Sequence, residues 1–200
     1  MHWVRNGAIA LAVALVGAVI WIGLQPQAPE LPINTRLGGA VTLTDQHGES
    51  FNTAALEGKV TFLFFGYTHC PDICPATLAR VTQVWKNLRK AGHGDDTAVV
   101  FITFDPARDT PEHIRKYLEF FDPNIVGLTG SAEQIQDAAE KYGVVFIQEE
   151  DETGVEGEES KGLFTHSDFI YLLDQQGRIR KLYPSNGDIQ EMVDDATSLL

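Results

Sequence analysis

Cysteine is scarce in this sequence of 200 residues, which contains only Cys70 and Cys74. A framework of structural disulfides needs more cysteines at wider spacing, because a disulfide stabilises a fold most when it closes a long loop. The sequence therefore excludes such a framework. Two cysteines this close together favour a redox pair or a metal site.

Basic residues are also few, with 15 Lys and Arg against 28 Asp and Glu and a formal charge of -13. Because a nucleic-acid partner needs a basic face, we expect no nucleic acid to bind. The apolar fraction of 44% and the charged fraction of 22% are ordinary for a globular domain. The length suits one domain with a short anchor.

Charge is absent from residues 7–24, which form one apolar run. As a helix this run would span about 27 Å, close to the roughly 30 Å of a bilayer. Arg5 precedes the run and the next basic residue is Arg36, which puts the N-terminus in the cytoplasm and the rest outside it. We expect residues 1–24 to be a membrane anchor with one transmembrane helix. A cleaved signal peptide is the alternative, although no clear cleavage site follows.

Residues 25–36 hold three prolines and few apolar groups, which is typical of an extended linker. Residues 37–200 are expected to form one domain, in which strands and helices alternate and a hairpin and a helix follow. That order predicts an α/β, thioredoxin-like fold with an N-terminal hairpin extension. The acidic stretch 149–159 is expected to be a solvated excursion between strands. The predicted strands are 41–45, 50–52, 59–66, 97–104, 126–128, 143–148, 167–173 and 178–183, and the predicted helices are 75–91, one opening at 110–113, 131–142 and 187–200.

The segment FGYTHCPDICP over residues 65–75 follows a buried strand and runs into a helix. Such a junction stabilises thiolates through backbone N–H groups and the helix dipole. Cys70 and Cys74 are four residues apart, which brings their side chains to one side of a helical turn, and Pro71 and Pro75 restrict the backbone beside them. We expect the two sulfurs to lie close enough to form a disulfide or to share one metal ion.

Three interpretations of the cysteine pair compete. Inert buried cysteines fit poorly with the polar residues that flank them. A thiol–disulfide oxidoreductase normally has two residues between its cysteines, and this segment has three. A metal site needs a third ligand, and two thiolates with one imidazole suit zinc or copper, with thiolate softness favouring Cu(I).

His166 is the preferred candidate for the third ligand. It precedes a predicted strand. In a thioredoxin-type fold, the loop before this strand faces the loop that carries the cysteines. A thioredoxin has a cis-proline at that place, whereas this chain has Thr165 and His166. His69 is the nearest alternative, but a side chain next to Cys70 in a loop is expected to point away from it.

A third block, FDPARDTP over residues 104–111, lies at the end of the second predicted buried strand. Sites in open α/β sheets form at the carboxyl ends of strands. Asp109 with Thr110 and Pro111 is explained as a helix start, and Arg108 is expected to pair locally. Asp105 is not explained in this way. We therefore expect its carboxylate to face the loop that carries the cysteines and to orient the metal ligands without binding the metal itself.

Together, FGYTHCPDICP, DPARDTP and THSDFIYLLDQQGRI resemble the Sco/SenC family of copper chaperones over residues 37–200. The resemblance implies a single-pass membrane protein whose thioredoxin-like domain binds one copper ion, as Cu(I) or Cu(II), through Cys70, Cys74 and His166. It implies a role in assembling the dinuclear copper site of cytochrome c oxidase. The expected partners are the copper-bearing subunit of that oxidase, a thioredoxin-like reductant and other copper carriers. The expected location is the bacterial inner membrane, with the soluble domain facing the periplasm.

An alternative of another class remains open. The chain is expected to be a carrier rather than an enzyme, but a membrane-anchored thiol–disulfide reductase would use the same pair, Cys70 and Cys74, as its catalytic residues. Such a reductase would act on the cysteines of the oxidase copper site without delivering copper. His166 discriminates, because a pure reductase should tolerate its loss. A redox or copper sensor is a third hypothesis.

Overall fold

A computed structural model describes residues 31–148 and 164–200 of the chain. The predicted anchor at 1–24 and the acidic stretch at 149–159 lie outside the described residues. Within the described part, strands and helices alternate as the sequence predicts, and the α/β class is confirmed. In chain order the elements are β1 (Thr42–Asp45), β2 (Ser50–Asn52), the 3-10 helix η1 (Thr53–Leu56), β3 (Val60–Gly66), α2 (Ile73–Lys90), β4 (Thr97–Thr103), α3 (Pro111–Glu119), β5 (Val126–Thr129), α4 (Ala132–Tyr142), β6 (Phe146–Gln148), β7 (Phe164–His166), β8 (Phe169–Leu173), β9 (Ile179–Pro184) and α5 (Ile189–Thr197).

The central sheet of the described residues has the order β2-β1-β5-β4-β3-β8-β9. Its middle strands β3, β4 and β5 are parallel, and β1 and β8 flank them in antiparallel pairing. Every residue of β3 and β4 is buried, which explains why both strands are continuous apolar runs instead of alternating ones. These strands end side by side, with Gly66 paired to Thr103, and the segments that follow them are therefore neighbours.

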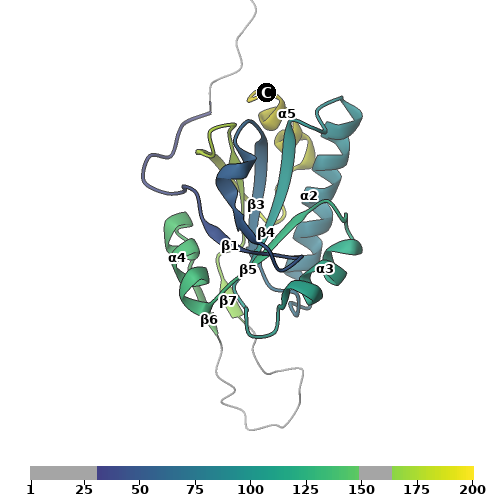
Figure 1. Cartoon of the computed structure of the whole chain (residues 1–200). Coiled ribbons are helices and arrows are strands. Elements are labelled where there is room, and N and C mark those ends of the chain that lie inside the picture. The colour runs from purple at the N-terminus through teal and green to yellow at the C-terminus, as the bar shows by residue number, and fades with distance from the viewer. Residues whose placement is uncertain (1–30, 149–163) are drawn as a thin grey trace, which may run out of the picture. The chain divides into compact units, whose positions relative to one another are not determined.

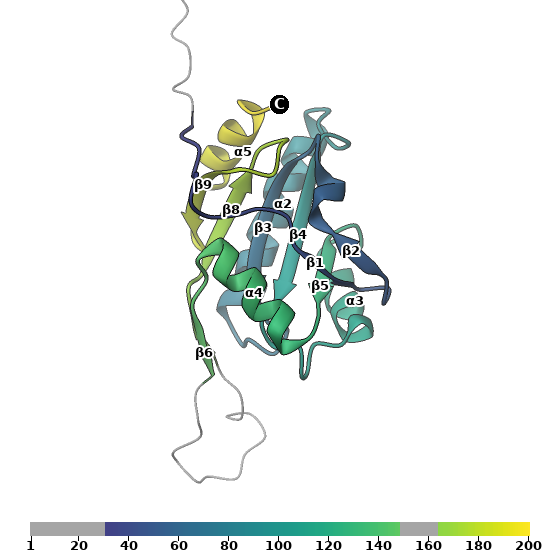
Figure 2. The same cartoon turned by 60° about the vertical axis from the view of Figure 1, so that its left-hand side comes forward.

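Helices cover both faces of the sheet. Helices α2, α3 and α5 lie on one face and α4 lies on the other (Figure 1, Figure 2). The predicted starts of α3 and α4 are confirmed, because Thr110 and Ser131 accept hydrogen bonds from backbone N–H groups in the first turns of these helices. Gly143 ends α4 with a φ of 68°, a left-handed conformation that favours glycine.

Two elements differ from the sequence prediction in ways that affect the site. Helix α2 begins at Ile73, two residues earlier than predicted, so Cys74 belongs to its first turn. The predicted strand 167–173 is shorter, and β7 precedes it as half of a separate two-stranded sheet with β6. The Ser167 N–H donates to the Val145 carbonyl, and this contact between distant segments is not visible in local sequence.

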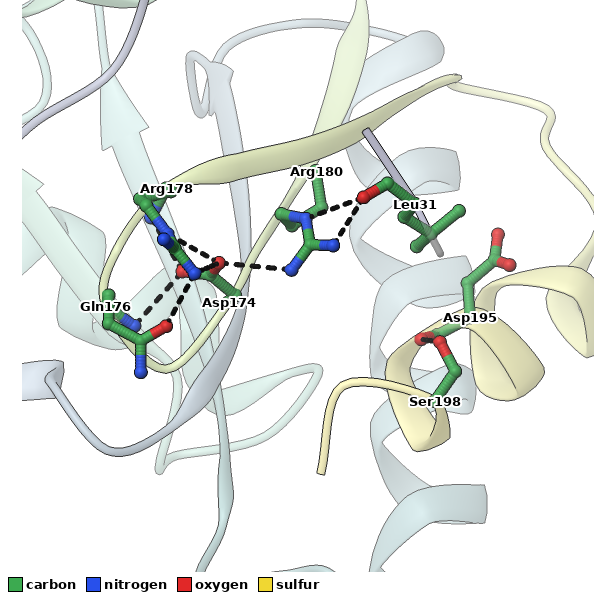
Figure 3. A network of polar contacts seen from close by, with 7 residues as sticks. All are labelled: Leu31, Asp174, Gln176, Arg178, Arg180, Asp195 and Ser198. Carbon is green, nitrogen blue, oxygen red and sulfur yellow. Dashed lines mark hydrogen bonds and ion pairs between the residues drawn. The ribbon is translucent and has the colours of Figure 1, made fainter. Parts of the chain in front are cut away.

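The last residues of the predicted linker 25–36 pack against β9. The Arg180 guanidinium donates to the Leu31 carbonyl (Figure 3). The Asn34 N–H donates to the Ile179 carbonyl at 2.8 Å. The Asn34 side chain also accepts from the Arg36 N–H, which forms a local turn. The compact unit accordingly begins at Leu31.

Candidate metal centre

The two cysteines lie where β3 leads into α2. Cys74 is fully buried in the first turn of α2, and Cys70 in the preceding loop is 8% exposed. The Cys74 N–H donates to the Cys70 Sγ at 3.4 Å, and the two cysteines are not joined by a disulfide in this structure. The sequence-predicted proximity of the pair is confirmed by this contact. We call residues 67–72 the cysteine loop.

Gly66 makes room for the buried sulfur. A Cβ at this position would lie 3.1 Å from the Cys74 Sγ and 2.7 Å from the Phe64 ring. The second distance is shorter than real Cβ contacts allow, so any larger residue would displace the ring or the sulfur. The glycine at the end of β3 is therefore a requirement of the thiol position.

The environment of Cys74 favours the protonated thiol. Its hydrogen bond with Cys70 and its burial both raise the pKa of the Cys74 thiol, and the nearby Asp109 carboxylate adds to the shift. A metal ion that binds this sulfur must displace a proton, which couples metal affinity to pH. A soft cation that forms a strong bond to thiolate suits such a site.

Asp109 fastens the cysteine loop to the end of β4. Its carboxylate is fully buried and accepts from the Thr68 N–H at 3.0 Å and from the Thr68 hydroxyl. It also accepts from the Thr103 hydroxyl at 2.6 Å. From the sequence, Asp109 was expected only as part of a helix start. Its hydrogen bonds to the cysteine loop were not predicted, because Thr68 lies 41 residues earlier in the chain.

Asp105, the residue predicted to support the site, has a different set of contacts. Its carboxylate forms an ion pair with Arg108, which confirms that Arg108 pairs locally. Its backbone N–H donates to the Thr103 hydroxyl at 2.9 Å, the same hydroxyl that binds Asp109. Asp105 thus touches the Asp109 network through Thr103, and a direct role of its carboxylate at the cysteines stays a prediction.

An aromatic cluster joins β7 to the cysteine loop. The Phe164 ring lies 5.2 Å from the Tyr67 ring and 5.1 Å from the Phe104 ring, and the Phe164 N–H donates to the Tyr67 hydroxyl at 3.4 Å. Contacts of this kind between edges and faces of aromatic rings are favourable. His166 is two residues beyond Phe164 on the same short strand, and its backbone pairs with Phe146.

The alternative ligand His69 is directed elsewhere. Its Nδ1 lies 3.1 Å from the Thr68 hydroxyl and 3.5 Å from the Asp109 carboxylate. These contacts place the His69 ring beside Asp109, and its orientation relative to Cys70 stays a prediction. Among the residues that the structure describes, no helix is long and apolar enough to cross a membrane.

Comparison with known proteins shows one consistent family. The SCO1/SenC family model matches residues 30–200. A SCO2-like protein of Rickettsia conorii is 36% identical over 190 residues, which cover 90% of this chain and 88% of that protein. Mitochondrial SCO2 of Saccharomyces cerevisiae is 40% identical over 154 residues, which cover 77% of this chain and 50% of the yeast protein.

Solved structures show the same similarity. The structure of Bradyrhizobium japonicum ScoI with copper bound has a TM-score of 0.71 and 34% identity, and the match covers 82% of this chain and 99% of that one. Arabidopsis thaliana ScoI with copper bound also has a TM-score of 0.71 and 34% identity. These matches confirm the predicted thioredoxin-like fold.

Proposed function

This chain belongs to the SCO1/SenC family, and on that premise we propose that it is a copper chaperone for cytochrome c oxidase assembly. The Sco family is one of cytochrome c oxidase assembly proteins. The proposed cargo is one copper ion, held by Cys70, Cys74 and His166. The observation that carries the proposal is the contact between the buried thiols, in which the Cys74 N–H lies 3.4 Å from the Cys70 Sγ.

The donor set suits copper. Two thiolates are soft ligands that favour Cu(I), and an added imidazole gives a three-coordinate site. His166 supplies that imidazole in the proposal, supported by the position of its backbone on β7 and the packing of Phe164 on Tyr67. A site of low coordination number leaves room for ligands of the recipient to replace these three one at a time.

The proposed cycle requires both cysteine side chains to be reduced before copper binds. In an oxidising compartment Cys70 and Cys74 form a disulfide, and a thioredoxin-like dithiol supplies two electrons and two protons to open it. Copper from another carrier then binds and is passed to the copper-bearing subunit of the oxidase. Residues 1–24 are proposed to anchor the chain in the inner membrane, with the domain in the periplasm.

Copper binding by the full chain tests the ligand assignment. We expect one Cu(I) per reduced chain, none bound tightly by the Cys70→Ser/Cys74→Ser variant, and at least about tenfold weaker binding by His166→Ala. Exposed His47, changed to Ala, is the matched control and should leave the affinity unchanged. Equal Cu(I) affinity in the wild type, His166→Ala and the cysteine variant would refute the assignment.

The reductase alternative is supported by the same closeness of the thiols, which puts a disulfide within reach. It predicts that His166→Ala reduces a disulfide substrate at the wild-type rate, and that the Cys70→Ser/Cys74→Ser variant does not. The carrier hypothesis instead predicts that the histidine variant loses the ability to metallate the oxidase copper site. Measuring both activities on the same variants separates the two functions.

A further inference from the structure

Three metal-ligating side chains converge beside the cysteine loop without taking part in the proposed copper site. They are His69 in the loop, Asp109 after β4 and His113 in the first turn of α3. One ligand atom of each lies within 4.8 Å of the others. The two imidazole rings are stacked, with centroids 5.0 Å apart and an angle of 8° between their planes.

The Asp109 carboxylate gives this cluster a negative centre. Within residues 31–148 and 164–200 no arginine or lysine pairs with it, and its partners are the N–H and hydroxyl of Thr68, the hydroxyl of Thr103 and the His69 ring. A buried carboxylate with only neutral donors is more costly than one paired with a cation. The oxygen nearest His69, Oδ1, accepts from one hydroxyl and keeps a lone pair available.

We propose that His69, Asp109 and His113 form a second metal site, distinct from the thiols, for a divalent transition-metal ion. Two imidazoles and one carboxylate suit Zn²⁺ and Cu²⁺, whereas Cu⁺ prefers thiolates. Of these two divalent ions Cu²⁺ binds more tightly to a given set of nitrogen and oxygen ligands. The His69 side chain is 42% exposed, so the ion can enter from solvent and a water molecule can complete its coordination.

The two sites are neighbours, since His69 immediately precedes Cys70. The nitrogen and oxygen ligands select the divalent ion, and the thiolates select the monovalent one. The chain thereby offers a separate ligand set for each oxidation state of copper. This inference stands on the geometry of the three side chains and does not depend on His166.

The test uses the full chain with Cys70→Ser, Cys74→Ser and His2→Ala as a background. The serines remove the thiolates, and the His2 change prevents the N-terminal amine and its neighbouring imidazole from capturing the probe. Titration with Cu²⁺, followed by electron paramagnetic resonance, should show one tightly bound ion per chain with hyperfine coupling to two imidazole nitrogens. Added Zn²⁺ should compete for the site.

Changing His69→Ala or His113→Ala in this background should each weaken Cu²⁺ binding at least about tenfold and remove one nitrogen coupling. His47→Ala is the control and should change neither quantity, and His166→Ala is measured beside it to detect a different ligand. Circular dichroism checks that each variant is folded. Absence of tight Cu²⁺ binding in the background, or binding that depends on His166 and not on His113, would overturn the proposal. Cu(I) binding by the cysteine-containing chain is measured separately, so failure of one site is distinguishable from failure of the other.

Discussion

Asp109 and Asp174 are both buried carboxylates, but they lie at opposite ends of the central sheet and have different partners. Asp109 is close to the carboxyl ends of β3 and β4, whereas Asp174 follows β8, whose last residue pairs with Thr61 at the start of β3. Asp174 is bound by the guanidinium groups of Arg178 and Arg180 (Figure 3). Asp109 is bound by hydroxyls, a backbone N–H and an imidazole.

The difference contrasts a carboxylate that stabilises the fold with one that we propose also binds a metal ion. Two cations neutralise Asp174, and one of them, Arg180, also holds the Leu31 carbonyl, so this network fixes the start of the domain to β9. Asp109 has no such cation among the described residues and lies beside the imidazoles of His69 and His113. A negative charge left without a cationic side chain is a feature that a bound metal ion or another charged ligand can use.

The largest effect is expected from Asp174→Asn, which should lower the free energy of unfolding by about 3 kcal/mol. Every group that faces this carboxylate is a donor: Oδ1 accepts from the Gln176 and Arg178 N–H groups, and Oδ2 accepts from the Arg178 and Arg180 side chains. The amide NH₂ of asparagine would therefore face donors in either orientation. Chemical denaturation measures the loss, and Cu(I) stoichiometry should be unchanged.

Asp96→Asn is the control for this substitution. Asp96 is exposed, and its change should alter stability by less than about 0.5 kcal/mol. An equally small loss for Asp174→Asn would contradict the structural role assigned to the arginine pair.

The dependence of the free energy of unfolding on pH, in the acidic range, should also reflect the hydrogen bonds of Asp174. Burial opposes ionisation of Asp174, but hydrogen bonds from the Arg178 side chain and from the backbone N–H groups of Arg178 and Gln176 outweigh it and lower its pKa below 3.8. Because the pKa is lower in the folded state, its stabilising contribution is complete well above pH 4. It is lost as the pH falls through the folded pKa. The stability difference between the wild type and Asp174→Asn should therefore shrink from pH 6 to pH 3, and a constant difference would contradict the assignment.

Thr103→Val should cost about 2 kcal/mol, because it removes a buried hydroxyl and keeps the shape of the side chain. That hydroxyl donates to Asp109 at 2.6 Å and accepts from the Asp105 N–H at 2.9 Å. Thr103→Ser retains the hydroxyl and should be the milder change. Thermal or chemical unfolding compares the two, and equal losses would mean that the methyl group matters more than the hydrogen bonds.

The contrast between the two carboxylates also shows what sequence alone could predict. The helix starts at Thr110 and Ser131 were predictable because a cap binds backbone groups within three residues. The closeness of Cys70 and Cys74 was also predicted from their short spacing, although only Cys74 lies in the helix and Cys70 lies in the loop before it. The spacing of residues along the sequence was thus sufficient to predict the cysteine pair and most boundaries of the helices and strands.

Contacts between distant segments were not accessible in this way. Asp109 was explained by the helix it precedes, while the hydroxyl that it binds in the cysteine loop belongs to Thr68, 41 residues earlier. Strand β7 was missed because its partner β6 lies beyond the acidic stretch. The block FDPARDTP correctly marked a site at the end of β4, but its pattern favoured Asp105 where the structure connects Asp109 to the cysteine loop.

Apart from the control at Asp96, the smallest loss of stability is expected from Asp109→Asn, at about 1 kcal/mol, although Asp109 is as buried as any residue that the structure describes. An asparagine oxygen can accept from the Thr68 N–H and the Thr103 hydroxyl, and its NH₂ can donate to the Thr68 hydroxyl, which in turn donates to the His69 Nδ1. The fold should thus tolerate the neutral side chain, unlike at Asp174. The Cu²⁺ affinity of the cysteine-free background should nevertheless fall at least about tenfold, because the charged ligand is gone. A large loss of stability with unchanged Cu²⁺ affinity would reverse the comparison and make Asp109 a structural residue like Asp174.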